Sequence, residues 1–128
     1  MITLKMDIID VSEKDDIIYL YGVTEKGETA IIKDENYSHY FYVSFDKNAD
    51  LEALIFQISG LISRKSGTEC TVLKVKLKTL KLLGEKKEFL KITVNNSKAV
   101  NEISGTLKNV EGIGKTYEKY VNFSKKYL

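Results

Sequence analysis

Aromatic and lysine side chains recur at every second position in two stretches of the chain, and this spacing could support binding chemistry. Residues 39–45 read His-Tyr-Phe-Tyr-Val-Ser-Phe, and residues 71–83 alternate apolar residues with lysines. Such alternation predicts β-strands whose two faces differ in polarity. Aromatic rings stack on bases and lysine ammonium groups meet phosphates, so the pattern indicates a surface for a single-stranded nucleic acid.

The predicted binding face carries the aromatic and lysine side chains that point away from the apolar positions of their strands. They are Tyr40, Tyr42, Lys74, Lys76, Lys78, Phe89 and Lys91. The alternative is an ordinary half-buried sheet, with tyrosines at the rim of a core and lysines that only solvate the surface. The sequence leaves both interpretations open.

Charge is distributed unevenly along the 128 residues, whose formal net charge is +2. Residues 1–36 hold nine acidic residues and four lysines, a net charge of −5. Residues 37–128 hold nine acidic and sixteen basic residues, a net charge of +7. A basic larger part favours a polyanionic partner, and a solvated lysine surface explains the same charge equally well.

Residue types for metal or nucleophilic chemistry are scarce. The chain has one cysteine, Cys70, and one histidine, His39, which cannot build a zinc site of the usual kind. No pattern supports a Cys–His catalytic pair, the acidic residues are scattered over turns and strand ends, and no P-loop occurs. We therefore expect no catalytic residues, no metal and no cofactor in this chain.

Two further features concern the compartment. A single cysteine cannot form an internal disulfide, which favours a reducing, cytoplasmic environment. No apolar run approaches the roughly 18 residues that a membrane span requires, so we expect no membrane partner.

Hydrophobic periodicity divides the chain into strands and helices. Period-two stretches predict strands at residues 2–11, 17–23, 28–33, 36–45, 71–83, 88–94 and 115–121. Helical spacing predicts one helix that begins near residue 50, capped by Asn48 or Asp50, and stops at Gly67. A second helix is predicted to begin with Ser97 as its cap and to end at the glycines 112 and 114, and residues 121–128 form a basic, aromatic tail.

The order of these elements predicts an α+β fold. Residues 1–36 form an antiparallel β meander, and residues 37–128 form a βαββαβ unit of the ferredoxin-like or RRM-like split β-α-β type. In that arrangement two helices cover one face of a four-stranded sheet. The other face, with its tyrosines and lysines, is left to bind a ligand or to be covered by the meander.

Several short motifs occur in the order known from one family. They are His39-Tyr40-Phe41-Tyr42, then Val72-Leu73-Lys74-Val75 with the Leu83-Gly84 hairpin, and finally Phe-Ser-Lys-Lys-Tyr-Leu at residues 123–128. In these motifs and in the order of its elements, the chain resembles the N-terminal domain of archaeal family B DNA polymerases.

The resemblance implies a domain that holds single-stranded template DNA ahead of the polymerase site and captures uracil, the product of cytosine deamination. Carried over to this chain, the uracil pocket would involve Ile8, His39, Tyr40, Val100, Val121, Phe123 and Lys126. Tyr40 and Val121 would act largely through backbone groups, Val100 would pack on the base, Phe123 would line the pocket and Lys126 would lie near phosphates. Periodicity alone makes Val100 an ordinary core residue of a helix.

The leading functional hypothesis is therefore a non-catalytic module that binds single-stranded template DNA for a family B polymerase, with uracil recognition. RNA is an alternative ligand, because an open sheet suits it equally well. The alternative of another class is a structural domain that docks on other polymerase domains or subunits without recognising bases. The sequence also leaves open whether the chain is a fragment of a polymerase or a separate protein.

Overall fold

Strands and helices account for most of the part of the chain that the structure describes. This computed structural model describes residues 2–24, 40–45, 51–82, 85–108 and 113–128. The strands are β1 (Ile2–Ser12), β2 (Ile17–Thr24), β3 (Tyr40–Phe45), β4 (Val72–Leu82) and β5 (Glu85–Val94). The helices are α1 (Leu51–Ser66), α2 (Ser97–Lys108) and α3 (Ile113–Tyr127). The predicted strand at residues 28–33 lies outside the described residues.

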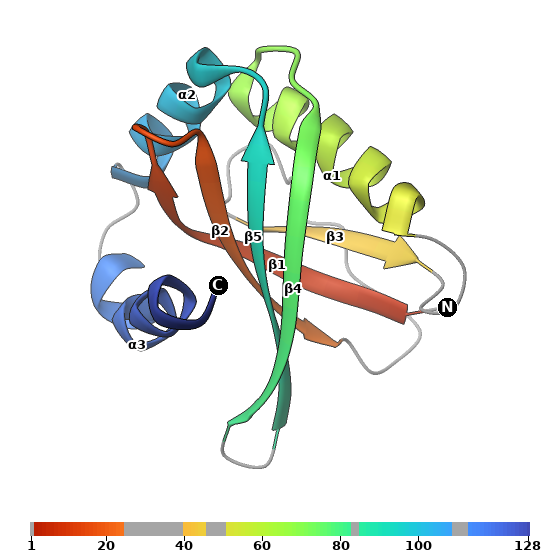
Figure 1. Ribbon diagram of the computed structural model, residues 1–128, viewed down its shortest axis with the longest axis vertical. Coiled ribbons are helices and arrows are strands. Elements are labelled where there is room, and N and C mark those ends of the chain that lie inside the picture. Colours follow the sequence, from red (N-terminus) through yellow and green to blue (C-terminus); the bar gives the residue numbers. More distant parts are fainter. Residues whose placement is uncertain (1, 25–39, 46–50, 83–84, 109–112) are drawn as a thin grey trace.

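The described strands form one antiparallel sheet in the order β3-β1-β2-β5-β4 (Figure 1). The predicted α+β class is confirmed, but the βαββαβ arrangement is wrong. Strands β1 and β2, predicted to pack on a separate unit, lie in the middle of the sheet between β3 and β5. The division at residue 36 is therefore not a division of the sheet, because both parts of the chain contribute strands to it.

Helices α1 and α2 cover one face of the sheet, and mostly aliphatic side chains, with Phe41 of β3 among them, fill the space between the helices and the sheet. In β1, Leu4, Met6 and Ile8 point toward these helices, as the period of two predicts. The buried stripe of α1 comes from residues at helical spacing, namely Leu54, Ile58, Leu61 and Ile62. We call this side of the sheet the aliphatic face.

Helix α3 covers the opposite face, where a last strand at residues 115–121 and a separate tail were predicted. That prediction is wrong, since residues 113–127 form one helix. The side chains of α3 that pack on the sheet are Tyr120, Val121 and Phe123, and Leu128, directly after the helix, packs with them. Dividing this segment at residue 121 hid its period. We call this side of the sheet the α3 face.

Local signals set the turns and helix ends. Gly67 follows α1 with a φ of 69°, the left-handed conformation that stops a helix, as predicted. Helix α2 is capped by Asn96 and not by the predicted Ser97, because the Asn96 side-chain oxygen accepts a hydrogen bond from the Lys98 N–H at 3.0 Å. The Ser97 hydroxyl instead lies 2.9 Å from a carboxylate oxygen of Asp16, in the β1–β2 turn.

Candidate nucleic-acid interface

The residues of the predicted uracil pocket do not come together in the part of the chain that the structure describes. Ile8 and Val100 are buried in the aliphatic face, between the sheet and α2. Val121 and Phe123 belong to α3 and pack on the other face of the same sheet. The sheet itself therefore separates the two pairs, and His39 lies outside the described residues.

Tyr40 and Tyr42 lie on the edge strand β3, on the α3 face of the sheet. The register pairs Tyr40 with Asp7 and Tyr42 with Lys5 of the neighbouring strand. The two rings meet edge to face with centroids 5.9 Å apart, and the Lys5 ammonium lies 4.7 Å from the Tyr40 centroid. The two predicted rings thus share a face of the sheet, and a cation lies beside one of them.

The predicted lysines lie at the opposite edge of the sheet, on β4. Lys74, Lys76 and Lys78 are all exposed, and the register pairs Lys76 with Lys91 and Lys78 with Phe89 of β5. Four strand spacings separate the edges β3 and β4, a distance of about 19 Å. The predicted aromatic and lysine residues thus share one face of the sheet but do not form one continuous surface.

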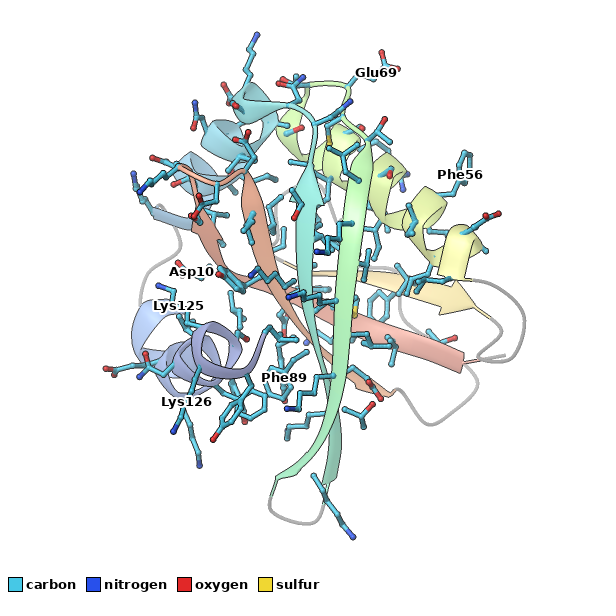
Figure 2. The ribbon with its side chains drawn as sticks, viewed as in Figure 1. Asp10, Phe56, Glu69, Phe89, Lys125 and Lys126 are labelled. Atoms are coloured by element: carbon cyan, nitrogen blue, oxygen red, sulfur yellow. The ribbon has the colours of Figure 1, made fainter. Side chains whose placement is uncertain are left out.

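Phe89 is not available for stacking on a base, which corrects its predicted role. Its side chain is fully buried beneath α3, where its ring centroid lies 4.5 Å from that of Phe123 and 5.9 Å from that of Tyr120 (Figure 2). The sequence placed Phe89 on the correct face. Phe89 is covered because residues 113–127 form a helix that packs on this face. The predicted strand at residues 115–121 would have left the face open.

The end of α3 reaches the lysines of β4 and β5. The Lys91 and Lys76 ammonium groups lie 3.2 and 3.5 Å from the main-chain oxygen of Leu128. The Tyr127 ring, half exposed, lies 4.9 Å from the Lys78 ammonium and 5.3 Å from that of Lys126. These two cation–π contacts bring together lysines that are 48 positions apart in the chain.

We use the name lysine–Tyr127 surface for five exposed residues, two at this end of α3 and three along β4. They are Lys74, Lys76, Lys78, Lys126 and Tyr127. Sequence reasoning missed Tyr127 because it treated residues 121–128 as a tail. The signal that could have found it is the spacing of four from Phe123, which places both rings on one side of a helix.

Buried polar groups lie under α3, between the helix and the sheet. Lys87 is only 8% exposed, and its ammonium donates a hydrogen bond of 2.6 Å to the hydroxyl of Tyr21. The Tyr21 ring stacks on that of Tyr120 with centroids 4.4 Å apart. Burial raises the pKa of Tyr21, while the hydrogen bond with Lys87 acts in the opposite direction. The hydrogen bond gives the buried ammonium a partner, and the ring stack connects β2 to α3.

An ion pair connects the same helix to β1. The Lys125 ammonium lies 2.9 Å from a carboxylate oxygen of Asp10, and Figure 2 shows the two side chains approaching each other at the side of the sheet. The hydrogen bond with Asp10 raises the pKa of Lys125, and partial burial opposes the shift. Both lysines are exposed, but Lys125 pairs with Asp10 of β1, whereas Lys126 lies near Tyr127.

Other chemistry has little support in the described residues. Within the described ranges, no group of three or more His, Cys, Asp or Glu residues is placed to hold a metal ion. Cys70 is buried, and burial raises the pKa of its thiol, which disfavours the reactive thiolate. Its N–H donates a hydrogen bond of 3.0 Å to the Ser63 hydroxyl, as expected of a residue that packs α1 on β4. None of the described helices has both the length and the apolar character needed to cross a bilayer.

Comparisons of this chain with protein-family models, with curated proteins and with solved structures found no match. The resemblance to archaeal family B polymerases therefore stays a prediction from the sequence motifs.

Proposed function

We propose that this protein is a non-catalytic binding module for a single-stranded nucleic acid, and that the lysine–Tyr127 surface is its contact site. The observation that carries the proposal is the half-exposed Tyr127 ring with two ammonium groups close to it, at the end of a row of lysines. A base stacks on such a ring while phosphates meet the lysines. Template DNA, the ligand implied by the resemblance, is the first candidate.

The spacing of the lysines supports an extended ligand. Lys74, Lys76 and Lys78 alternate along β4, so their Cα atoms are about 6.6 Å apart along the strand. All three project from the α3 face at an exposed edge. The net charge of +7 on residues 37–128 acts in the same direction, because it raises the local concentration of a polyanion.

Sequence-tolerant binding fits this surface better than uracil recognition. A ring and ammonium groups contact features that every nucleotide has. The groups carried over for uracil, such as Val100 and Phe123, lie on opposite faces of the sheet. We therefore propose binding with little base preference.

Fluorescence anisotropy with a labelled oligothymidine strand at low salt tests the proposal. Replacing Lys74, Lys76 and Lys78 together by Gln is expected to weaken binding strongly and to reduce the slope of log K against log salt by about 2. Tyr127→Ala is expected to weaken binding by about 1–3 kcal/mol, with little change in the salt slope. In a charge-matched control, Gln replaces three other exposed lysines, Lys14 in the β1–β2 turn and Lys98 and Lys108 on α2.

Equal losses in the β4 triple variant and in the control would show that only net charge matters, and would reject this surface. Absence of binding by the unmodified protein at low salt would reject the function itself. Strands with uracil, thymine or cytosine at one position are expected to bind equally. A matched RNA strand shows whether the 2′-hydroxyl contributes.

A further inference from the structure

The outward side of α1 carries an apolar ring that packs on nothing described in this chain. Phe56 is 81% exposed, whereas the opposite side of the same helix is buried in the aliphatic face. Figure 2 shows the Phe56 side chain pointing away from the body of the molecule. An exposed aromatic ring of this size favours burial against a partner.

Gly60, one turn after Phe56, is equally unexplained by the packing of a single chain. A side chain added at this position would meet nothing within 4 Å, and the backbone there is helical. Glycine weakens the interior of a helix, so an alanine would suit the isolated chain better. Shallow hollows lie on both sides of Phe56 and both extend to Gly60, one lined by Tyr42 and Arg64 and the other by Ile55 and Ser63.

The outward side of α1 is complementary, in shape and in charge, to the same side of a second, antiparallel copy of this helix. Phe56 and Gly60 are equally distant from position 58, and so are Glu52 and Arg64. In an antiparallel pair of such helices related by a two-fold axis at this level, the ring of one copy therefore faces the glycine of the other. The carboxylate at one end likewise faces the guanidinium at the other end.

We propose that α1 is a self-association surface on which a second copy of this chain docks antiparallel, with Phe56 over the other copy's Gly60 and Glu52 opposite the other copy's Arg64. The absence of a side chain at Gly60 gives the ring its space. Residues at spacing four form the ridge that packs in the most common class of helix pair, with axes crossing at about 50°. This proposal does not depend on the nucleic-acid proposal.

The size and position of the surface define what kind of dimer is expected. One helix pair buries less than the roughly 1,200 Å² of a standard interface, so the dimer is expected to be weak and concentration-dependent. The docking side of α1 is the outward side of the helix layer that covers the aliphatic face, whereas the lysine–Tyr127 surface lies on the opposite side of the sheet. A dimer would therefore leave both lysine–Tyr127 surfaces accessible.

Sedimentation velocity over a wide range of protein concentration tests the proposal. The unmodified protein is expected to move from monomer to dimer as concentration rises, and Phe56→Ser is expected to weaken dimerisation about tenfold or more. Tyr127→Ser is the matched control, because it removes an exposed ring from the opposite face. Circular dichroism checks that both variants keep the fold, which is expected because both positions are exposed.

Charge exchange tests the antiparallel geometry. Glu52→Arg or Arg64→Glu alone places like charges together twice in the dimer, and each is expected to weaken it about three- to tenfold. The double variant restores opposite charges across the interface and is expected to regain most of the affinity. Within one helix the two positions are about 18 Å apart, so the restoration cannot arise inside a chain.

Three results would overturn the proposal. The first is a protein that stays monomeric at the highest concentration reached. The second is a dimer that Phe56→Ser leaves intact. The third is a double variant weaker than either single exchange, which would mean that the copies pair in another orientation or that this face takes a different partner.

Discussion

The two faces of the sheet are stabilised by different chemistry. The aliphatic face is closed by two helices whose buried side chains are almost all aliphatic, such as Ile58 and Ile103. The α3 face is closed by one helix that uses aromatic rings and buries a lysine, Lys87, between itself and the sheet. Aliphatic packing is insensitive to pH and salt, whereas a buried polar arrangement depends on every partner it contains. We therefore expect changes of pH or salt, and single substitutions, to affect the stability of the α3 face more than that of the aliphatic face.

The sharpest test of this comparison is to remove one ring from beneath α3. Phe89→Ala deletes a fully buried side chain that contacts two rings of the helix, so the free energy of unfolding is expected to fall by about 4 kcal/mol. Urea unfolding followed by circular dichroism measures the loss. The control is Phe56→Ala, where the ring is exposed and the expected change is below about 0.5 kcal/mol. Similar losses in the two variants would mean that α3 adds little to stability.

A second, smaller effect is expected from the hydrogen bond between Lys87 and Tyr21. Tyr21→Phe keeps the ring stack on Tyr120 but removes the oxygen that accepts from the buried ammonium. The expected cost at neutral pH is about 2 kcal/mol, since one partner of the bond is charged. Chemical denaturation of both proteins at pH 7 measures it.

Because of the same pair, the protein is expected to lose stability at alkaline pH. The pKa of Tyr21 is raised in the folded protein, so folding favours its protonated form. That contribution is complete below the pKa of an unfolded tyrosine, about 10, and is lost as pH rises through the raised pKa. The unfolding free energies of the unmodified protein and of Tyr21→Phe should therefore converge in this range. A gap that stays constant up to pH 11 would contradict the assignment.

The aliphatic face offers a third test at a helix end rather than in a core. Asn96→Ala removes the side chain that caps α2 and is expected to lower the free energy of unfolding by about 1 kcal/mol. Ser97→Ala, at the position that the sequence predicts as the cap, should cost less because its hydroxyl makes an exposed contact with Asp16. Thermal unfolding of the two variants shows which loses more stability. A larger loss in Ser97→Ala would mean that Ser97 is the cap, as the sequence predicts.

The smallest effect is expected from the ion pair that connects α3 to β1. Asp10→Asn removes the charge that faces Lys125, and about 0.5 kcal/mol is expected because the Lys125 side chain is more than half exposed. The effect should shrink further at 1 M salt, where charges are screened. Unfolding at low and high salt measures both. An effect that does not change with salt would indicate packing rather than charge.

The same contrast explains how much of the fold could be predicted from sequence. The sequence located strands β1, β2 and β4 and helix α1 because each has a local signal, alternation in the strands and helical spacing in the helix. The position of β2 beside β5 was missed, because pairing between distant strands leaves no local period.

The candidate site was predicted only in part, for a physical reason. The lysines of β4 were found because alternation on an edge strand keeps one set of side chains in water. Phe89 was placed on the correct face but expected to be open. Tyr127 was missed because the helix that carries it has few strongly apolar residues, and aromatic residues next to Val121 also suit a strand.

Strand β4 has a consequence for how this protein stays apart from its own copies. Among the described strands, only β5 pairs with it, so the main-chain groups along its other side point outward. Such a border invites another chain to add a strand, and closely spaced lysines oppose this by repulsion. The lysines proposed to hold a polyanion would thus also prevent aggregation. A polyanion that neutralises them would bring separate molecules closer to edge-to-edge association, and loss of these charges would have a cost in solubility even where binding is not required.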